Sequence, residues 1–297
     1  MNRGRVRTNR IVTDAGLLAA AIAIPFLSGC TKNETVANNP QKGASLLTLW
    51  SPPTPQEAAA WAVDPYDADK RYRGTLLLAN APWGGEAVYL DLYRAATKDG
   101  DPSVRAAAIR GLALHGEPTD VPVILGHFDD PDRLLRWECA RALQRLHNPE
   151  AVAPLLKHLQ ERNETEPIVR AASANALGQY AEPRVLEGLI GGLSDRDLSV
   201  NIASQDALRT LTGQDLGLDV REWVAWRKAT ESPFAGRQPY EYPVFHRSRH
   251  WYEWVPMVGK PPNETPAAPV GLDGATRAAA TTRENAPVEE PGFVRDE

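Results

Sequence analysis

Few side chains in this sequence have the types and spacing that catalysis or metal binding requires. His158 and Glu161 lie three residues apart in an expected helix, but a single pair of this kind is common on solvated helices. The chain contains no glycine-rich phosphate loop, no Cys-x-x-Cys, no Gly-x-Ser-x-Gly and no His-Glu-x-x-His, so the usual signatures of nucleotide, thiol, serine and zinc chemistry are missing. We therefore expect no catalytic residue, no metal ion and no cofactor.

Three arginines are the strongest candidates for a binding site. Arg110 and Arg141 are 31 residues apart, and Arg145 follows Arg141 by one helical turn. The corresponding later positions hold Asn175 and Asp206, so this column changes from basic to acidic along the chain. A basic cluster on an acidic protein can attract an acidic segment. We expect these arginines to bind a protein or peptide partner on a concave face, and the alternative is that they are exposed polar side chains without a partner.

The helices that must position these residues recur with a period of 31 to 34 residues. Each of four reference residues has an acid six residues before it and a leucine seven residues after it. The reference residues are Arg105, Arg136, Arg170 and Asn201, with the acids Asp99, Asp130, Glu164 and Asp195 and the leucines Leu112, Leu143, Leu177 and Leu208. Arg71 and Leu78 form a weaker upstream copy. Such self-similarity predicts an all-α fold, an α-solenoid of antiparallel helix pairs.

A column of small residues lies three positions after each reference residue and consists of Gly74, Ala108, Cys139, Ser173 and Ser204. Small side chains let neighbouring helices approach closely, while the leucine one turn later fills the space between them. Because Cys139 belongs to this column, we expect it to be a buried packing residue and not a reactive thiol.

The pairs Asp99…Arg105, Asp130…Arg136 and Glu164…Arg170 resemble the Asp–Arg ladder of HEAT repeats. The sequence is most similar to the short bacterial kind, which also occurs in the HEAT-like repeats of phycobilisome lyases. The resemblance covers about residues 54–230 and implies about 4–5 repeats that act mainly as a binding scaffold. Asn201 replaces the arginine in the last copy, so the ladder should be weaker there.

Another branch of HEAT-like proteins consists of hydroxylases that hold two irons with adjacent His-Glu pairs in several repeats. In this chain no histidine is followed by glutamate, and Glu138 is preceded by Trp137. We therefore place the chain outside that branch and expect that it is not an enzyme.

The expected helices follow from the repeat and from its proline and capping residues. A first helix covers residues 54–62, and longer inner helices cover residues 67–80, 102–115, 132–147, 167–181 and 197–212. Outer helices cover residues 85–98, 119–128, 149–161 and 183–193, and a last helix at residues 219–229 caps the array. Pro102, Pro149, Pro167 and Pro183 suit the first turns of these helices.

The flanking segments have a different composition. Residues 1–29 have a basic start and a short apolar stretch ending in Leu27-Ser28-Gly29-Cys30, which resembles a lipoprotein signal peptide with its lipobox. The resemblance implies lipidation of Cys30 and attachment to a membrane through this lipid, and the alternative is an ordinary secretory signal. We expect a flexible tether at residues 30–53 and a disordered tail at 259–297. An aromatic and proline-rich extended segment at 231–258 should lie along the array, and the alternative is a peptide that recruits a partner. The tail carries Glu284, Glu289 and Glu290, which could themselves occupy the arginine groove.

The charge and these features together give the functional expectation. Without residues 1–29, which hold four arginines and one aspartate, the net charge changes from −5 to −8, which argues against nucleic-acid binding. We expect a monomeric, lipid-anchored, non-enzymatic scaffold of the cell envelope, on the outer face of the inner membrane or in the outer membrane, that binds a protein or peptide. The alternatives are an accessory or lyase-like protein with a small-molecule or pigment site in the repeats, and an envelope spacer without a ligand.

Overall fold

The computed structural model describes residues 53–244, 248, 250 and 264–272. In these residues every regular element is helical, as the repeat predicts. The α-helices are α1 (Pro55–Ala62), α2 (Ala68–Asn80), α3 (Ala87–Ala96), α4 (Pro102–His115), α5 (Val121–Leu125), α6 (Arg133–Arg145), α7 (Val152–His158), α8 (Pro167–Leu177), α9 (Pro183–Gly192), α10 (Leu198–Thr212) and α11 (Val220–Ala229). Two 3-10 turns, η2 (Pro118–Asp120) and η3 (Pro149–Ala151), precede α5 and α7. The prediction of an all-α solenoid is confirmed.

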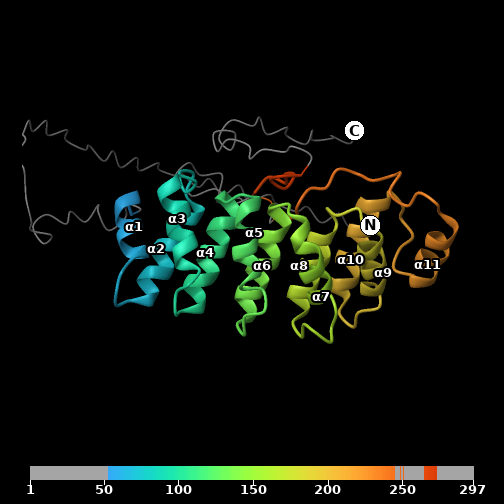
Figure 1. The fold of residues 1–297 in the computed structure, drawn as a ribbon, viewed down its shortest axis with the longest axis horizontal. Coiled ribbons are helices and arrows are strands. Elements are labelled where there is room, and N and C mark those ends of the chain that lie inside the picture. The colour runs from blue at the N-terminus through green and yellow to red at the C-terminus, as the bar shows by residue number, and fades with distance from the viewer. Residues whose placement is uncertain (1–52, 245–247, 249, 251–263, 273–297) are drawn as a thin grey trace, which may run out of the picture. The chain divides into compact units, whose positions relative to one another are not determined.

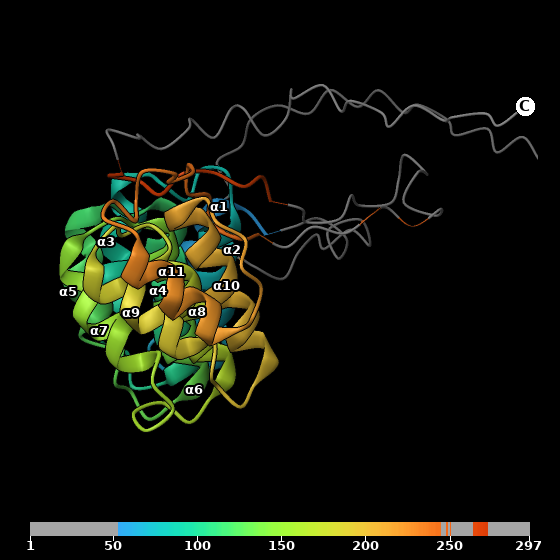
Figure 2. The ribbon, with the colours of Figure 1, turned by 90° about the vertical axis from the view of Figure 1, so that its right-hand side faces the viewer.

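The helices form two layers. The inner helices α2, α4, α6, α8 and α10 pack side by side in chain order, and the outer helices α3, α5, α7 and α9 cover their other side (Figures 1 and 2). Aspartate side chains begin several inner helices, since Asp101, Asp132 and Asp197 each accept a hydrogen bond from a first-turn backbone N–H. In Figure 1 the inner helices run in the same direction, so these capped starts lie at one edge of the layer and the helix ends lie at the other.

The core includes the two columns that the repeat predicts. Leu78, Leu112, Leu143, Leu177 and Leu208 are all fully buried, and so are the small residues of the second column that have side chains. At Gly74 an added Cβ would lie 2.3 Å from the backbone nitrogen of Ala62. Close helix contact in the first repeat therefore depends on glycine.

The Asp–Arg ladder links consecutive repeats, because each arginine binds the acid of the following one. The shortest nitrogen–oxygen distances are 2.7 Å for Arg71–Asp99, 2.9 Å for Arg105–Asp130, 2.7 Å for Arg136–Glu164 and 2.8 Å for Arg170–Asp195. Each arginine also donates to the backbone carbonyl of the acid six residues before it, apart from Arg71, which uses Asp64, seven residues before it. In the last repeat Asn201 donates only to backbone carbonyls, including Asp195 O at 3.0 Å, so no charge pair continues the ladder there.

Several boundaries differ from the prediction, and among the inner helices α8 ends at Leu177 and not at 181. The outer helices α5 and α7 are shorter because Pro122 and Pro154 have no N–H for the carbonyls four residues earlier, and 3-10 turns form instead. Helix α6 ends at Arg145 and not at 147, because Leu146 adopts an extended conformation and pairs with Val270. The end of α6 is therefore set by a tertiary contact with a distant segment of the chain.

The closing helix lies where the sequence predicts it. Asp219 accepts a hydrogen bond from Arg221 N at 2.8 Å and so caps α11. Helix α11 packs against α9, and its Trp223 is fully buried. The signal segment, Cys30 and the acidic tail with Glu284, Glu289 and Glu290 lie outside the described residues.

Candidate binding site at the arginine cluster

The three arginines of the predicted site converge around one glutamate. Arg110 of α4 lies 3.8 Å from Glu138 Oε1, and Arg141 of α6 lies 3.7 Å from the same oxygen. Arg145 belongs to the same face of α6, because residues 138, 141 and 145 are spaced by three and four positions. Arg110 also donates to Asn80 Oδ1 at 3.2 Å, and the Arg141 guanidinium lies 4.8 Å from the centroid of the Trp137 ring.

The cluster is much less exposed than the sequence predicts. The exposed fraction of the side chain is 28% for Arg110, 22% for Arg141 and 9% for Arg145. Burial raises the pKa of Glu138, although Arg141 and Arg110 act to lower it. The alternative that these arginines are exposed polar side chains without a partner is therefore wrong. Partly buried cations need anionic partners, because burying an unpaired charge is costly.

A carboxylate from a distant part of the chain binds the cluster. Arg145 forms an ion pair with Glu264, which is 119 residues later in the sequence. Burial alone would raise the pKa of Glu264, but the charges of Arg145, Arg141 and Arg110 outweigh this effect and lower it. On the other side of Arg145, the guanidinium lies 4.4 Å from the ring centroid of Tyr242. Arg145 is thus held between an aromatic ring and a carboxylate.

The segment that carries Glu264 pairs with the end of α6 through its backbone. Val270 N donates to Arg145 O and His147 N donates to Val270 O, each at 2.9 Å, so that Val270 and Leu146 form a parallel bridge. Gly271 has φ +91°, and an added Cβ would lie 2.6 Å from the Pro118 ring. Position 271 therefore requires glycine for its conformation and for its close approach to the array.

Residues 237–242 lie across the same edge of the array. Gln238 N donates to Thr210 O at 2.8 Å, the Arg237 guanidinium to Gln179 O at 3.0 Å, and Tyr240 OH to Asn175 O at 2.9 Å. Carbonyls at the C-terminal ends of helices lack intrahelical partners, so these donors satisfy them. In Figure 1 the orange and red stretches run along this edge, above α10, α8 and α6.

The structure brings together only part of the predicted column. Asn175 contributes its carbonyl to Tyr240, whereas Asp206 is exposed and lies 3.6 Å from Arg209. Sequence reasoning missed Glu138 and Glu264 as members of the site. A single acid in a proline-rich segment, such as Glu264, has no periodicity that could connect it to a helix more than a hundred residues away.

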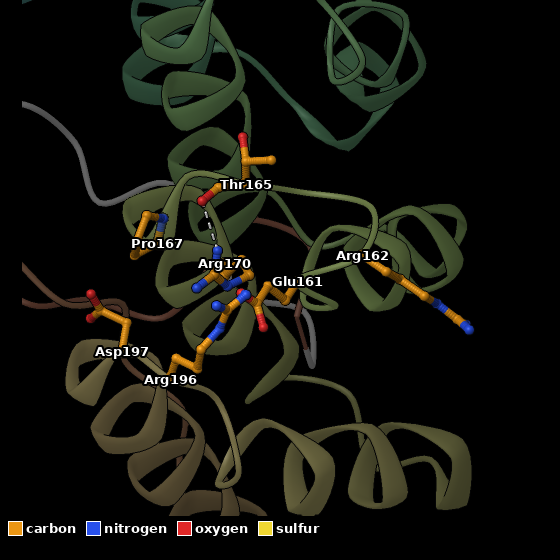
Figure 3. Close-up of a pocket in the computed structure, with 7 residues that line it drawn as sticks. All are labelled: Glu161, Arg162, Thr165, Pro167, Arg170, Arg196 and Asp197. Atoms are coloured by element: carbon orange, nitrogen blue, oxygen red, sulfur yellow. Dashed lines mark hydrogen bonds and ion pairs between the residues drawn. The ribbon is translucent and has the colours of Figure 1, made fainter.

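A depression elsewhere on the described surface does not form a comparable site. It has a volume of about 700 Å³ and lies at the edge where the inner helices begin, between the starts of α8 and α10 (Figure 3). Arg170 donates a hydrogen bond to Thr165 O and forms an ion pair with Asp195, and Arg196 forms an ion pair with Glu161. Figure 3 shows Arg162 pointing away from these groups. No free polar groups converge there.

Two further groups with potential chemistry are packing residues. Cys139 is fully buried and its pKa is raised by burial, which disfavours the reactive thiolate. His158 stacks on Phe128 and its two ring nitrogens lie 3.3 Å from Glu164 and 3.0 Å from Asp129. Because these carboxylates lie at opposite nitrogens, they cannot share one ion with the ring.

The repeats are recognisable beyond this chain. The family model of HEAT repeats matches residues 89–166 and 128–209, so the array is built of HEAT repeats. Deoxyhypusine hydroxylase of Rattus norvegicus is 36% identical over 103 residues, which cover 35% of this chain and 33% of the rat protein. The human protein of that name has the same identity and coverage, and the one from Eremothecium gossypii is 37% identical over 81 residues, 27% of this chain and 25% of that protein.

The chain thus spans about a third or less of the length of the curated relatives that it matches. These relatives are enzymes by name, so the expectation of a non-enzymatic scaffold is wrong. They also overturn the expectation of a lipid-anchored lipoprotein scaffold of the cell envelope, since the relatives of the array are hydroxylases of rat, human and cattle. In the described part of the chain no helix is long and apolar enough to cross a membrane.

The residues present do not fit a two-metal site built from adjacent His-Glu pairs in several repeats. No histidine is followed by glutamate, and the described residues include no group of three or more His, Cys, Asp and Glu side chains that could hold a metal ion. Glu138, the glutamate nearest to that pattern, lies between arginines, and these cations would repel a bound metal ion.

Proposed function

We propose that the inner helices bind an extended segment of a substrate or partner protein through a carboxylate held by Arg110, Arg141 and Arg145. The observation that carries this proposal is the ion pair between Arg145 and Glu264. Arg145 is 9% exposed while Glu264 binds it, so the cluster holds a carboxylate from an extended segment in a partly desolvated place, where an ion pair is stronger than in water. Its three cations outnumber Glu138 and Glu264, so it attracts negative charge.

The proposal is specific about the chemistry of the ligand. Guanidinium groups bind carboxylates through paired N–H donors, and the ring of Tyr242 restricts the orientation of Arg145. Because the site is partly buried, its attraction is less screened by salt than that of a surface pair. A cationic side chain would instead be repelled. The site therefore selects acidic segments.

A direct test uses full-length protein with Glu264→Gln, in which the internal carboxylate is absent. A fluorescein-labelled peptide with the sequence of residues 264–272 is titrated by fluorescence anisotropy, in parallel with the same peptide carrying glutamine in place of its glutamate. We expect the glutamate peptide to bind roughly tenfold more tightly, as for a charged hydrogen-bonded pair of about 1.5 kcal/mol.

A second substitution, Arg145→Gln, should remove the difference between the two peptides. Arg133→Gln is the matched control, since Arg133 belongs to the same helix but is 66% exposed, and it should leave the difference intact. Equal binding of both peptides to the Glu264→Gln protein would refute carboxylate recognition at this site.

The activity named for the relatives is the second candidate function, and the shared identity of 36% with the rat and human hydroxylases favours it. Its test is incubation of the full chain and iron(II) with a deoxyhypusine-containing substrate, followed by mass spectrometry for an added oxygen atom. Hydroxylation would establish this activity with a donor set other than His-Glu pairs. An unmodified substrate, alongside turnover by the rat enzyme, would exclude it.

A further inference from the structure

We propose that residues 264–272 are an internal ligand of the array, and that an external ligand displaces them as an extended segment that pairs with Leu146. This inference rests on the proposed function and adds two elements to it. The ligand is recognised by its backbone as well as by its carboxylate, and the chain regulates access to its own site.

The first argument is the way in which the segment is held. Glu264 binds Arg145 through its carboxylate, Ala267 O accepts a hydrogen bond from Tyr242 N at 3.1 Å, and Val270 forms the bridge with Leu146, followed by Gly271 and the buried Leu272. Thr265, Pro266 and Ala268 between these contacts are exposed. A segment held by a few separate contacts can dissociate one contact at a time.

The second argument concerns the surface that the segment covers. Leu146 follows the end of α6 in extended conformation, and the backbone groups on either side of it, Arg145 O and His147 N, pair with a neighbouring strand. Val270 accepts from His147 N and donates to Arg145 O, which is the mode of strand addition by which many domains bind extended peptides. Any incoming peptide that donates and accepts at the same two places satisfies the same groups.

The third argument is the requirement at Gly271. Its φ of +91° and the 2.6 Å approach of an added Cβ to Pro118 mean that a side chain there must move the segment away from the array. The ligand therefore has an acidic residue, followed six positions later by a residue that pairs with Leu146, and then by glycine. This is the chemical class of ligand that the site accepts: an extended acidic peptide with a glycine after its pairing residue.

Displacement is governed by effective concentration. A segment joined to the array by the same chain competes at a local concentration on the order of millimolar. An external ligand must therefore bind more tightly than the internal segment, or must arrive when the internal segment is modified. Weakening the internal segment without altering the site should make the external ligand bind better.

The experiment compares full-length wild type with Gly271→Ala, using the labelled peptide of residues 264–272. The substitution strains the internal segment and leaves the arginines intact, so we expect roughly tenfold tighter binding of the peptide to the variant. Thr265→Ala is the matched control, because Thr265 is exposed within the same segment, and it should bind as wild type does. Hydrogen exchange at the His147 amide should accelerate in Gly271→Ala and remain slow in Thr265→Ala.

A third peptide separates this inference from the proposed function. Its valine is N-methylated, which removes the N–H donor and retains the carboxylate, and it should bind Gly271→Ala about threefold to tenfold more weakly. Unchanged affinity for this peptide, together with loss of affinity on replacing its glutamate by glutamine, overturns strand pairing and leaves carboxylate recognition standing. Weaker binding of the N-methylated peptide, together with unchanged affinity on replacing the glutamate by glutamine, overturns carboxylate recognition and leaves strand pairing standing. Equal binding to wild type and Gly271→Ala overturns the role of the segment as a competitor.

Discussion

Glu164 connects two repeats through charge, and the stability lost on its substitution should depend on pH in a defined way. Its carboxylate lies 2.7 Å from Arg136 and 3.3 Å from His158, and it accepts a hydrogen bond from Glu166 N at 3.0 Å. Burial alone would raise its pKa, but these hydrogen bonds lower it from the ordinary 4.5 to about 2. At about 1.4 kcal/mol per pH unit, this shift corresponds to roughly 3 kcal/mol of stability at neutral pH.

The substitution Glu164→Gln retains the shape of the side chain and removes its charge. Since the folded-state pKa is depressed, the contribution of Glu164 is complete above pH 4.5 and is lost as the pH falls towards 2. Urea unfolding at neutral pH should therefore give a variant that is about 3 kcal/mol less stable than wild type. The two proteins should converge in stability as the pH is lowered through this window.

The control is Glu187→Gln on the exposed face of α9, which should change the free energy of unfolding by less than about 0.5 kcal/mol at every pH. A deficit of Glu164→Gln that stays constant from neutral pH down to pH 2 would contradict the reasoning. Such a result would mean that the loss comes from packing and not from the ionised carboxylate.

Three other predictions concern the core. Leu143→Ala and Leu78→Ala should each destabilise the array by about 2–5 kcal/mol in urea unfolding, because both leucines are fully buried; a much smaller loss at Leu78 would mean that the first repeat unfolds separately. Gly74→Ala should lower the thermal unfolding midpoint, since its Cβ would overlap the backbone of α1, and an unchanged midpoint would contradict that contact. Cys139 should react with a thiol reagent only as fast as the protein unfolds, because burial raises the pKa of its thiol; rapid labelling of the native protein would argue against its burial.

The similarity to the hydroxylases shows that an absence of His-Glu pairs does not by itself exclude a relationship with them. Because no histidine is followed by glutamate, we expected the chain to lie outside the di-iron hydroxylases. The relatives of the array are nevertheless named as hydroxylases. A repeat is recognised by packing residues distributed over all its helices, whereas a metal site depends on a few side chains. Similarity of the array can therefore persist where the metal-binding residues differ.

The sequence predicted that Arg110, Arg141 and Arg145 lie together, and the structure brings them together in different surroundings; that they bind a partner stays a prediction. Arg110, Arg141 and Arg145 could be found because they follow the helical repeat, and spacing along helices determines which side chains share a face. The low exposure of these side chains could not be predicted from helical spacing. It results from Tyr242 and Glu264, which come from segments without a repeat.

The sequence by itself determined the array, because its information is local and repeated. Aspartate and proline mark the starts of helices, leucine and small residues alternate at helical spacing, and each arginine meets an acid of the next repeat. The tertiary structure alone decided where α6 ends and which carboxylate meets Arg145. Both depend on the docking of Glu264 and Val270, more than a hundred residues away in the chain. Contacts between a repeating helix and a non-repeating segment leave no periodic trace in the sequence, so only the folded chain reveals them.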